Sequence, residues 1–180
     1  MTDQLFLETR DMKIEGRNVV GRCVPYNETS YLVPSPNGER IQRGAFKESI
    51  AQRGLNIFLN LEHDERRTVA KAVRWDDGED GLVGEFHFRN AEETDRTLEE
   101  LRDGWWPFMS VAFRPLRQGR GSDGAVEVRT AKLAHVALVK CPAYDGAEVL
   151  AVRHESDPHR VLEAFGSRPD IDLTPIPRFW

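Results

Sequence analysis

Residues 108–113 read FMSVAF, a short apolar strand with one hydroxyl, that of Ser110, in its middle. A buried hydroxyl needs a hydrogen-bond partner, because leaving it unpaired costs about 1 to 3 kcal/mol. A neighbouring backbone carbonyl is the simplest such partner. The other serines fall in predicted loops, on a helix surface or in the C-terminal segment: Ser30, Ser35, Ser49, Ser122, Ser156 and Ser167. Ser110 is therefore the serine whose position is most informative.

Outward from this stretch, most of the chain reads as further strands. Residues 55–61 alternate apolar and polar side chains, which is the two-residue period of a strand with one buried face. The sequence Asp-Asp-Gly at 76–78 predicts a turn between two strands, and a glycine-rich turn is expected at 118–124. The remaining predicted strands are residues 5–9, 18–24, 69–75, 81–88, 126–130 and 133–139.

Two segments predict helices. Residues 45–53 have apolar side chains four apart and precede Gly54, which favours a short helix ended by a left-handed glycine. Residues 91–103 follow Asn90, which with Glu93 resembles a capping box, and predict an amphipathic helix. Residues 31–43 predict a surface loop. The predicted fold is mainly β (α+β), an antiparallel β-barrel or curled sheet with a few peripheral helices.

The composition limits the classes of function. The 180 residues suit one domain, predicted at 1–152, with a flexible tail at 153–180. A net charge of −5 argues against nucleic acid as a partner. We find no apolar run of membrane-spanning length and no signal sequence, so we expect a cytoplasmic protein without membrane contact. Cys23 and Cys141 lack metal-site spacing and are expected to be reduced thiols.

Two histidines add to the interest of Ser110. His63 ends the apolar face of the 55–61 strand, and His135 lies in a strand that is apolar on both faces. A hydroxyl nucleophile needs an adjacent base, and that base needs a third group to hold its tautomer. His87 is predicted to face solvent, and His154 and His159 lie in the tail. A zinc site from His63, His87 and His135 is an alternative, although the HExxH spacing is missing.

The sequence resembles the prohead maturation proteases of tailed bacteriophages and, through them, the herpesvirus assemblins. The resemblance covers about residues 15 to 150. It is carried by RGAF at 43–46, LEHD at 61–64, DGL at 80–82, Gly104, FMSVAF at 108–113 and LVKCPAY at 138–144. It implies a herpesvirus-protease-like fold with Ser110 as nucleophile, His63 as general base and His135 as the group that orients the base.

Phage members of the family commonly have an acidic residue at the third position, so Asp64, Asp145 and Glu148 are the substitutes if His135 is structural. The resemblance places an oxyanion donor near Ala143 and Tyr144. It implies a serine endopeptidase that needs no cofactor or metal and cleaves phage scaffold and major capsid protein. This cleavage would occur inside the assembling prohead, in the cytoplasm of the infected or lysogenic bacterium.

Three questions stay open at this point. A noncatalytic capsid-assembly binding module is the alternative function. Self-association of the chain is undecided. The segment after residue 152 is a candidate for self-cleavage.

Overall fold

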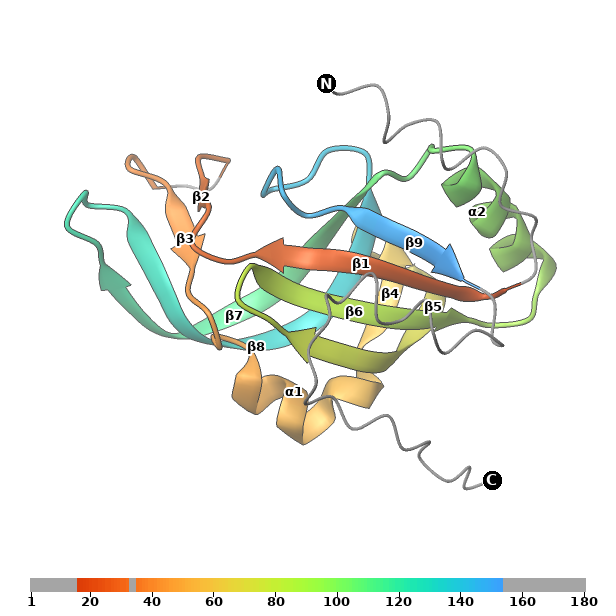
Figure 1. Cartoon of the computed structure of the whole chain (residues 1–180), viewed down its shortest axis with the longest axis horizontal. Helices are drawn as coiled ribbons and strands as arrows, with labels where there is room; N and C mark the ends of the chain where they lie inside the picture. The colour runs from red at the N-terminus through yellow and green to blue at the C-terminus, as the bar shows by residue number, and fades with distance from the viewer. Residues whose placement is uncertain (1–15, 33–34, 154–180) are drawn as a thin grey trace.

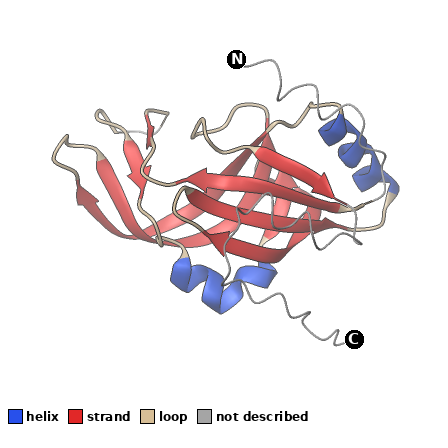
Figure 2. Ribbon diagram, in the orientation of Figure 1, coloured by secondary structure: helices blue, strands red, loops and turns tan. Residues whose placement is uncertain are grey.

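The computed structural model describes residues 16–32 and 35–153 and has a mainly β architecture (Figures 1 and 2). The strands are β1 (Asn18–Pro25), β2 (Thr29–Ser30), β3 (Glu39–Ile41), β4 (Phe58–Leu61), β5 (Asp64–Asp77), β6 (Gly81–Phe88), β7 (Phe108–Arg120), β8 (Val126–Val139) and β9 (Val149–Arg153). The helices are α1 (Lys47–Arg53), the short 3₁₀ helix η2 (Gly54–Asn56) and α2 (Glu92–Arg102). No helix in these residues is both long and apolar enough to cross a bilayer.

All strands belong to one curled sheet, and β8 is its organising strand. One edge of β8 pairs antiparallel with β7 along nearly its whole length. The other edge pairs in parallel with β3 and then with β4. The order continues from β4 through β5, β6 and β1 to β9. In Figure 1 the β1, β6 and β5 strands lie in front of β7, β8 and β4, so the sheet curls around the core.

Alternation along the strands builds this core. In β6 the side chains of Leu82, Phe86 and Phe88 are fully buried, whereas Val83 and Glu85 between them are half-buried. Strand β8 contributes Leu133, Val136 and Leu138 to the same cluster. The area that these side chains remove from water is the main favourable term in folding.

A close approach of β1 to the start of β7 closes the curl. The backbone at 147–149 lies between them, where Met109 N–H donates to Ala147 O at 3.0 Å and Arg22 N–H donates to Glu148 O at 2.8 Å. Gly21 faces this contact, and a Cβ placed there would lie 2.4 Å from Met109 Sδ. A side chain at position 21 would therefore displace the Met109 side chain or the backbone at Glu148, next to the strand that carries Ser110.

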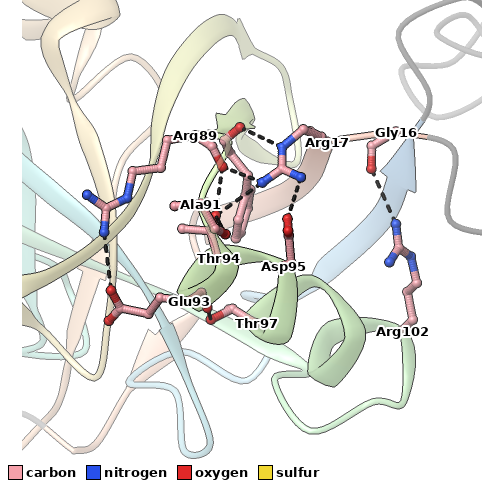
Figure 3. A network of polar contacts seen from close by, with 10 residues as sticks. Gly16, Arg17, Arg89, Ala91, Glu93, Thr94, Asp95, Thr97 and Arg102 are labelled. Carbon is pink, nitrogen blue, oxygen red and sulfur yellow. Dashed lines mark hydrogen bonds and ion pairs between the residues drawn. The ribbon is translucent and has the colours of Figure 1, made fainter.

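Helix α2 is anchored to the sheet by the network of polar contacts shown in Figure 3. The Arg17 guanidinium donates to Phe88 O at 3.2 Å, to Arg89 O, to Thr94 Oγ1 at 3.1 Å and to Asp95 Oδ1 at 2.5 Å. At the other end of the helix, Arg102 donates to Gly16 O at 3.3 Å. The chain leaves α2 through Gly104, whose φ is +77°, and then enters β7. The network thus fixes the approach to the serine strand.

The predicted mainly β, curled-sheet fold is confirmed, and so are the positions of the 81–88 strand and of both helices. The two parallel pairings of β8 were not predicted. The predicted strands at 126–130 and 133–139 form the single strand β8, which is bulged opposite the step from Ala112 to Phe113. The predicted strand at 5–9 and nearly all of the predicted tail at 153–180 lie outside the described residues.

Several local predictions are wrong for identifiable reasons. Gly54 has φ −53° and continues into η2 instead of ending α1 in the left-handed region, and the next strand starts only at Phe58. Asn90 does not cap α2, because Ala91 occupies the cap position and has no side-chain bond. Residues 31–43 include β3, whose Ile41 is fully buried.

Two serines assigned to the surface are also buried. Ser30 lies in β2, where its Oγ donates to Ala143 O. Ser49 on α1 is buried as well, and its Oγ accepts a hydrogen bond from Leu133 N–H at 2.9 Å. Both serines lie in short elements, where a single polar residue shows no periodic pattern that would predict its burial.

Candidate active site

Ser110 lies near the start of β7, and only 8% of the residue is exposed. It stands opposite Ala137 of β8 in the antiparallel ladder, while Ala112 stands opposite His135. Directly paired residues, and residues two apart on one strand, project from the same face of a sheet. Ser110 and His135 therefore project from one face, the face turned away from the apolar core.

His63 reaches this region from a tight turn and not from a strand, which corrects the expectation that it ends an apolar strand face. Glu62 and His63 are the two central residues of the hairpin between β4 and β5, since Leu61 pairs with Asp64. Both have positive φ, 50° and 59°, as a type I′ turn requires. Asn and Gly are the usual residues there, because a side chain in this region costs about 1 kcal/mol or more. His63 itself is exposed.

The two histidines are in direct contact. His63 Nδ1 lies 3.0 Å from His135 Nε2, and the ring centroids are 5.2 Å apart. A hydrogen bond between them requires one nitrogen to donate and the other to accept. If His63 carries its proton on Nδ1 and donates to His135, its Nε2 is left with a free lone pair. That is the tautomer a general base needs.

The environment of His63 favours its neutral form. Although His63 is exposed, partial desolvation of its imidazole lowers the pKa of His63 below its ordinary value, and the adjacent His135 lowers it further, while Glu62 opposes the change. A neutral imidazole can accept a proton at neutral pH, whereas an imidazolium cannot.

Ser110 does not bond to either imidazole in this structure; among the described residues, the hydrogen bonds of the site join only the two histidines. The sheet register still makes Ser110 a diagonal neighbour of His135, and such neighbours are about 7 to 8 Å apart between backbones. His63 and His135 are thus in contact, and Ser110 lies on the same face of the sheet as His135. Nucleophile–base contacts are often long without substrate and shorten when it binds.

The described residues do not form the alternative zinc site. Within residues 16–32 and 35–153, no group of three His, Cys, Asp or Glu side chains is arranged to hold a metal ion. His87 lies on β6, half-buried, with its Nδ1 2.7 Å from Asn18 Oδ1. His154 and His159 lie outside the described residues.

Sequence reasoning missed one polar residue beside the site. Asn60 of β4 pairs with Ala137, which in turn pairs with Ser110, so the three residues cross adjacent strands in one row. Asn60 is 1% exposed, and its Oδ1 has no hydrogen-bond partner among the described residues. Its place in the polar phase of an alternating strand predicted exposure. The sequence pattern gave no sign that Asn60 is buried, and so no sign of this orphaned acceptor.

A groove of about 730 Å³ opens at the same end of the sheet. The residue before His63, Glu62, lines it together with Trp105 and Trp106, which precede the serine strand. Trp106 is buried and donates to Glu100 Oε2 at 2.9 Å, whereas Trp105 is 63% exposed. The other lining residues come from the end of β4, from β5, from α2 and from the segment after β8: Leu61, Arg67, Glu93, Arg96, Thr97, Glu100 and Lys140.

Comparison with solved structures finds similar folds in viral proteases. The bacteriophage T4 capsid assembly protease, gp21, aligns with a TM-score of 0.53 and 12% identity, over 69% of this chain and 81% of that one. The KSHV protease, in complex with a hexapeptide phosphonate inhibitor, aligns with a TM-score of 0.48 and 11% identity, over 74% of this chain and 64% of that one. At 12% identity, the T4 alignment indicates a shared fold. Curated proteins give no significant match.

A family model identifies the class of protein. The model described as caudovirus prohead serine protease matches residues 6–160, which include every strand, both helices and the three predicted site residues. The chain belongs to this family of prohead serine proteases, and the predicted family resemblance is confirmed.

Proposed function

We propose that this chain is a serine endopeptidase in which Ser110 is the nucleophile, His63 the general base and His135 the group that orients His63. The observation that carries the proposal is the 3.0 Å contact from His63 Nδ1 to His135 Nε2, which directs the other nitrogen of His63 away from its partner. Ser110 lies on the same sheet face, in the middle of an otherwise apolar strand.

The proposed reaction follows from these positions. His63 Nε2 removes the proton from Ser110 Oγ as the oxygen attacks the carbonyl carbon of a peptide bond. The imidazolium then gives this proton to the leaving amine, and a water molecule releases the acyl group by the same route in reverse. His135 holds His63 in the productive tautomer. Because a neutral imidazole stabilises the imidazolium less than a carboxylate does, we expect slow turnover.

The oxyanion of the tetrahedral intermediate needs backbone N–H donors. The candidates remain Ala143 and Tyr144, in the segment between β8 and the backbone that bonds to the start of β7. Among the described residues, the N–H groups of Ala143 and Tyr144 donate to no recorded acceptor, whereas Tyr144 O accepts from Ala147 N–H at 3.0 Å. Donors without internal partners are available to a ligand.

The proposed substrates are segments of phage scaffold and major capsid protein, cut within the assembling prohead in the host cytoplasm. The groove beside Trp105 would hold substrate side chains on one side of the scissile bond, because it adjoins both the His63 turn and the approach to the Ser110 strand. The segment 153–180, proposed as a separate tail, is a candidate for self-cleavage. The rival function is a capsid-assembly module that binds these partners without hydrolysis.

Co-expression with a scaffold or capsid substrate separates the two functions. We expect the wild-type chain to process the substrate and Ser110→Ala to abolish processing, because no other group replaces the attacking oxygen. The matched control is Ser122→Ala, which removes an exposed hydroxyl from the turn between β7 and β8 and should process normally. Thermal unfolding of each variant checks the fold. Continued processing by a folded Ser110→Ala chain would remove Ser110 from its role.

A further inference from the structure

A carboxylate stands at the outer nitrogen of His135. Glu65, the second residue of β5, places its Oε1 3.6 Å from His135 Nδ1. The His135 side chain is only 14% exposed, whereas that of Glu65 is 83% exposed. At this distance the contact is longer than a hydrogen bond. The carboxylate reaches His135 from the solvent side, and the rest of the imidazole is largely covered.

Of the three other carboxylates considered for the third position, two are engaged elsewhere. Asp64 bonds to Arg66 at 3.1 Å, and the contact with Arg66 lowers the pKa of Asp64. Glu148 pairs with Arg22 at 3.3 Å. Asp145 is exposed in the segment after β8, with no ion pair recorded in the described residues. Glu65 is thus the acidic residue that the structure brings to Nδ1 of His135.

The position of Glu65 sets the direction of the proton chain. A carboxylate at His135 Nδ1 favours the tautomer with the proton on Nδ1, which leaves Nε2 of His135 as an acceptor. His135 can then accept only from His63 Nδ1–H. As a result, His63 Nε2 is unprotonated, in the state required to receive the proton of Ser110. Without Glu65 the opposite polarity, which disables His63 as a base, gains population.

We infer that Glu65 is a positioning residue that acts through His135, so that the chain uses the relay Ser110–His63–His135–Glu65. The inference rests on the proposed function. Glu65 also stabilises the positive charge that the histidine pair carries when His63 is protonated. Because the carboxylate is exposed, solvent and salt screen this effect, and it is modest.

The charges around His135 come from four directions. His63 faces its Nε2 from the β4–β5 turn and Glu65 faces its Nδ1 from β5. Along the same sheet face, Lys132 of β8 stands opposite Arg114 of β7.

The test is the pH profile of kcat/KM for a cleavable scaffold-derived peptide, measured for wild type, Glu65→Gln and Glu65→Asp. Loss of the carboxylate destabilises the protonated histidine pair, so the acid limb of Glu65→Gln should move to lower pH. The plateau should fall by about 2- to 5-fold, the range of an exposed charge pair. The deficit should shrink at high salt as the wild type loses the same interaction. Glu65→Asp should recover part of both effects.

Glu79→Gln is the control, since it removes an exposed carboxylate that pairs with Arg43 between β5 and β6, away from both histidines, and its profile should match wild type. A Glu65→Gln profile that superimposes on wild type would overturn the inference. Failure of the proposed function looks different: activity would then survive Ser110→Ala. An inactive Ser110→Ala chain together with an unchanged Glu65→Gln profile rejects only the role of Glu65.

Discussion

His63 occupies a backbone position that a histidine rarely takes. The chain accepts two consecutive positive φ values at Glu62 and His63, where Asn-Gly would be relaxed. Strain of this kind persists where the surrounding structure enforces it, and it concentrates at functional sites. Here it turns the imidazole back toward His135. Residue order alone suggested that His63 mattered, but the turn that delivers it was read as the end of a strand.

The pH dependence of Ser110 reactivity follows from the environment of His63. Partial desolvation and the neighbouring His135 lower the pKa of His63 below the ordinary histidine value of about 6.5. A base must be unprotonated, so a lowered pKa extends activity toward acid. We expect the rate of Ser110 phosphonylation by a fluorophosphonate to reach half of its maximum below about pH 6.5. The rate is measured by quenching the labelling reaction at timed intervals and determining the intact mass of the chain. A half-maximal rate above about pH 6.5 would contradict the assignment.

Strands and helices with a strong hydrophobic periodicity were predicted well, and those with a weak periodicity were not. The alternation of residues 81–88 predicted β6 with its observed bounds, because a half-buried strand leaves a two-residue pattern. The same rule failed for Asn60, which is buried although Phe58, two residues earlier on the same strand, is 46% exposed. Parallel pairing of β4 with β8 joins segments more than seventy residues apart, and no local pattern encodes it. The site depends on that pairing, so its geometry could not be predicted from the sequence.

The close contact between β1 and β7 leads to a prediction about stability. In Gly21→Ala the new Cβ would meet Met109 Sδ at 2.4 Å and Glu148 O at 2.9 Å. Overpacking of this kind costs about 1 to 3 kcal/mol, so the urea midpoint should fall by a corresponding amount. Gly78→Ala is the control, because its nearest neighbour would be 3.5 Å away, and we expect a change within about 0.5 kcal/mol. Equal midpoints for the two variants would show that the contact at Gly21 relaxes freely.

For the whole molecule, the curled sheet collects functional features at one end. The His63 turn, the start of the serine strand and the groove beside Trp105 all lie where β4 and β8 finish, next to the residues of α2 that line the groove. Each comes from a different part of the chain, so the site exists only when the sheet has closed. The predicted domain 1–152 and its boundary at 153 stay predictions.

The most direct measurement is covalent labelling of the intact chain with a fluorophosphonate, followed by digestion and mass mapping. The account predicts one phosphonyl group per chain, on Ser110, unchanged in Ser122→Ala, strongly slowed in His63→Ala and absent from Ser110→Ala. A folded wild-type chain that stays unlabelled, or a label that persists in Ser110→Ala, would contradict the central claim that a histidine-activated serine on β7 performs the chemistry.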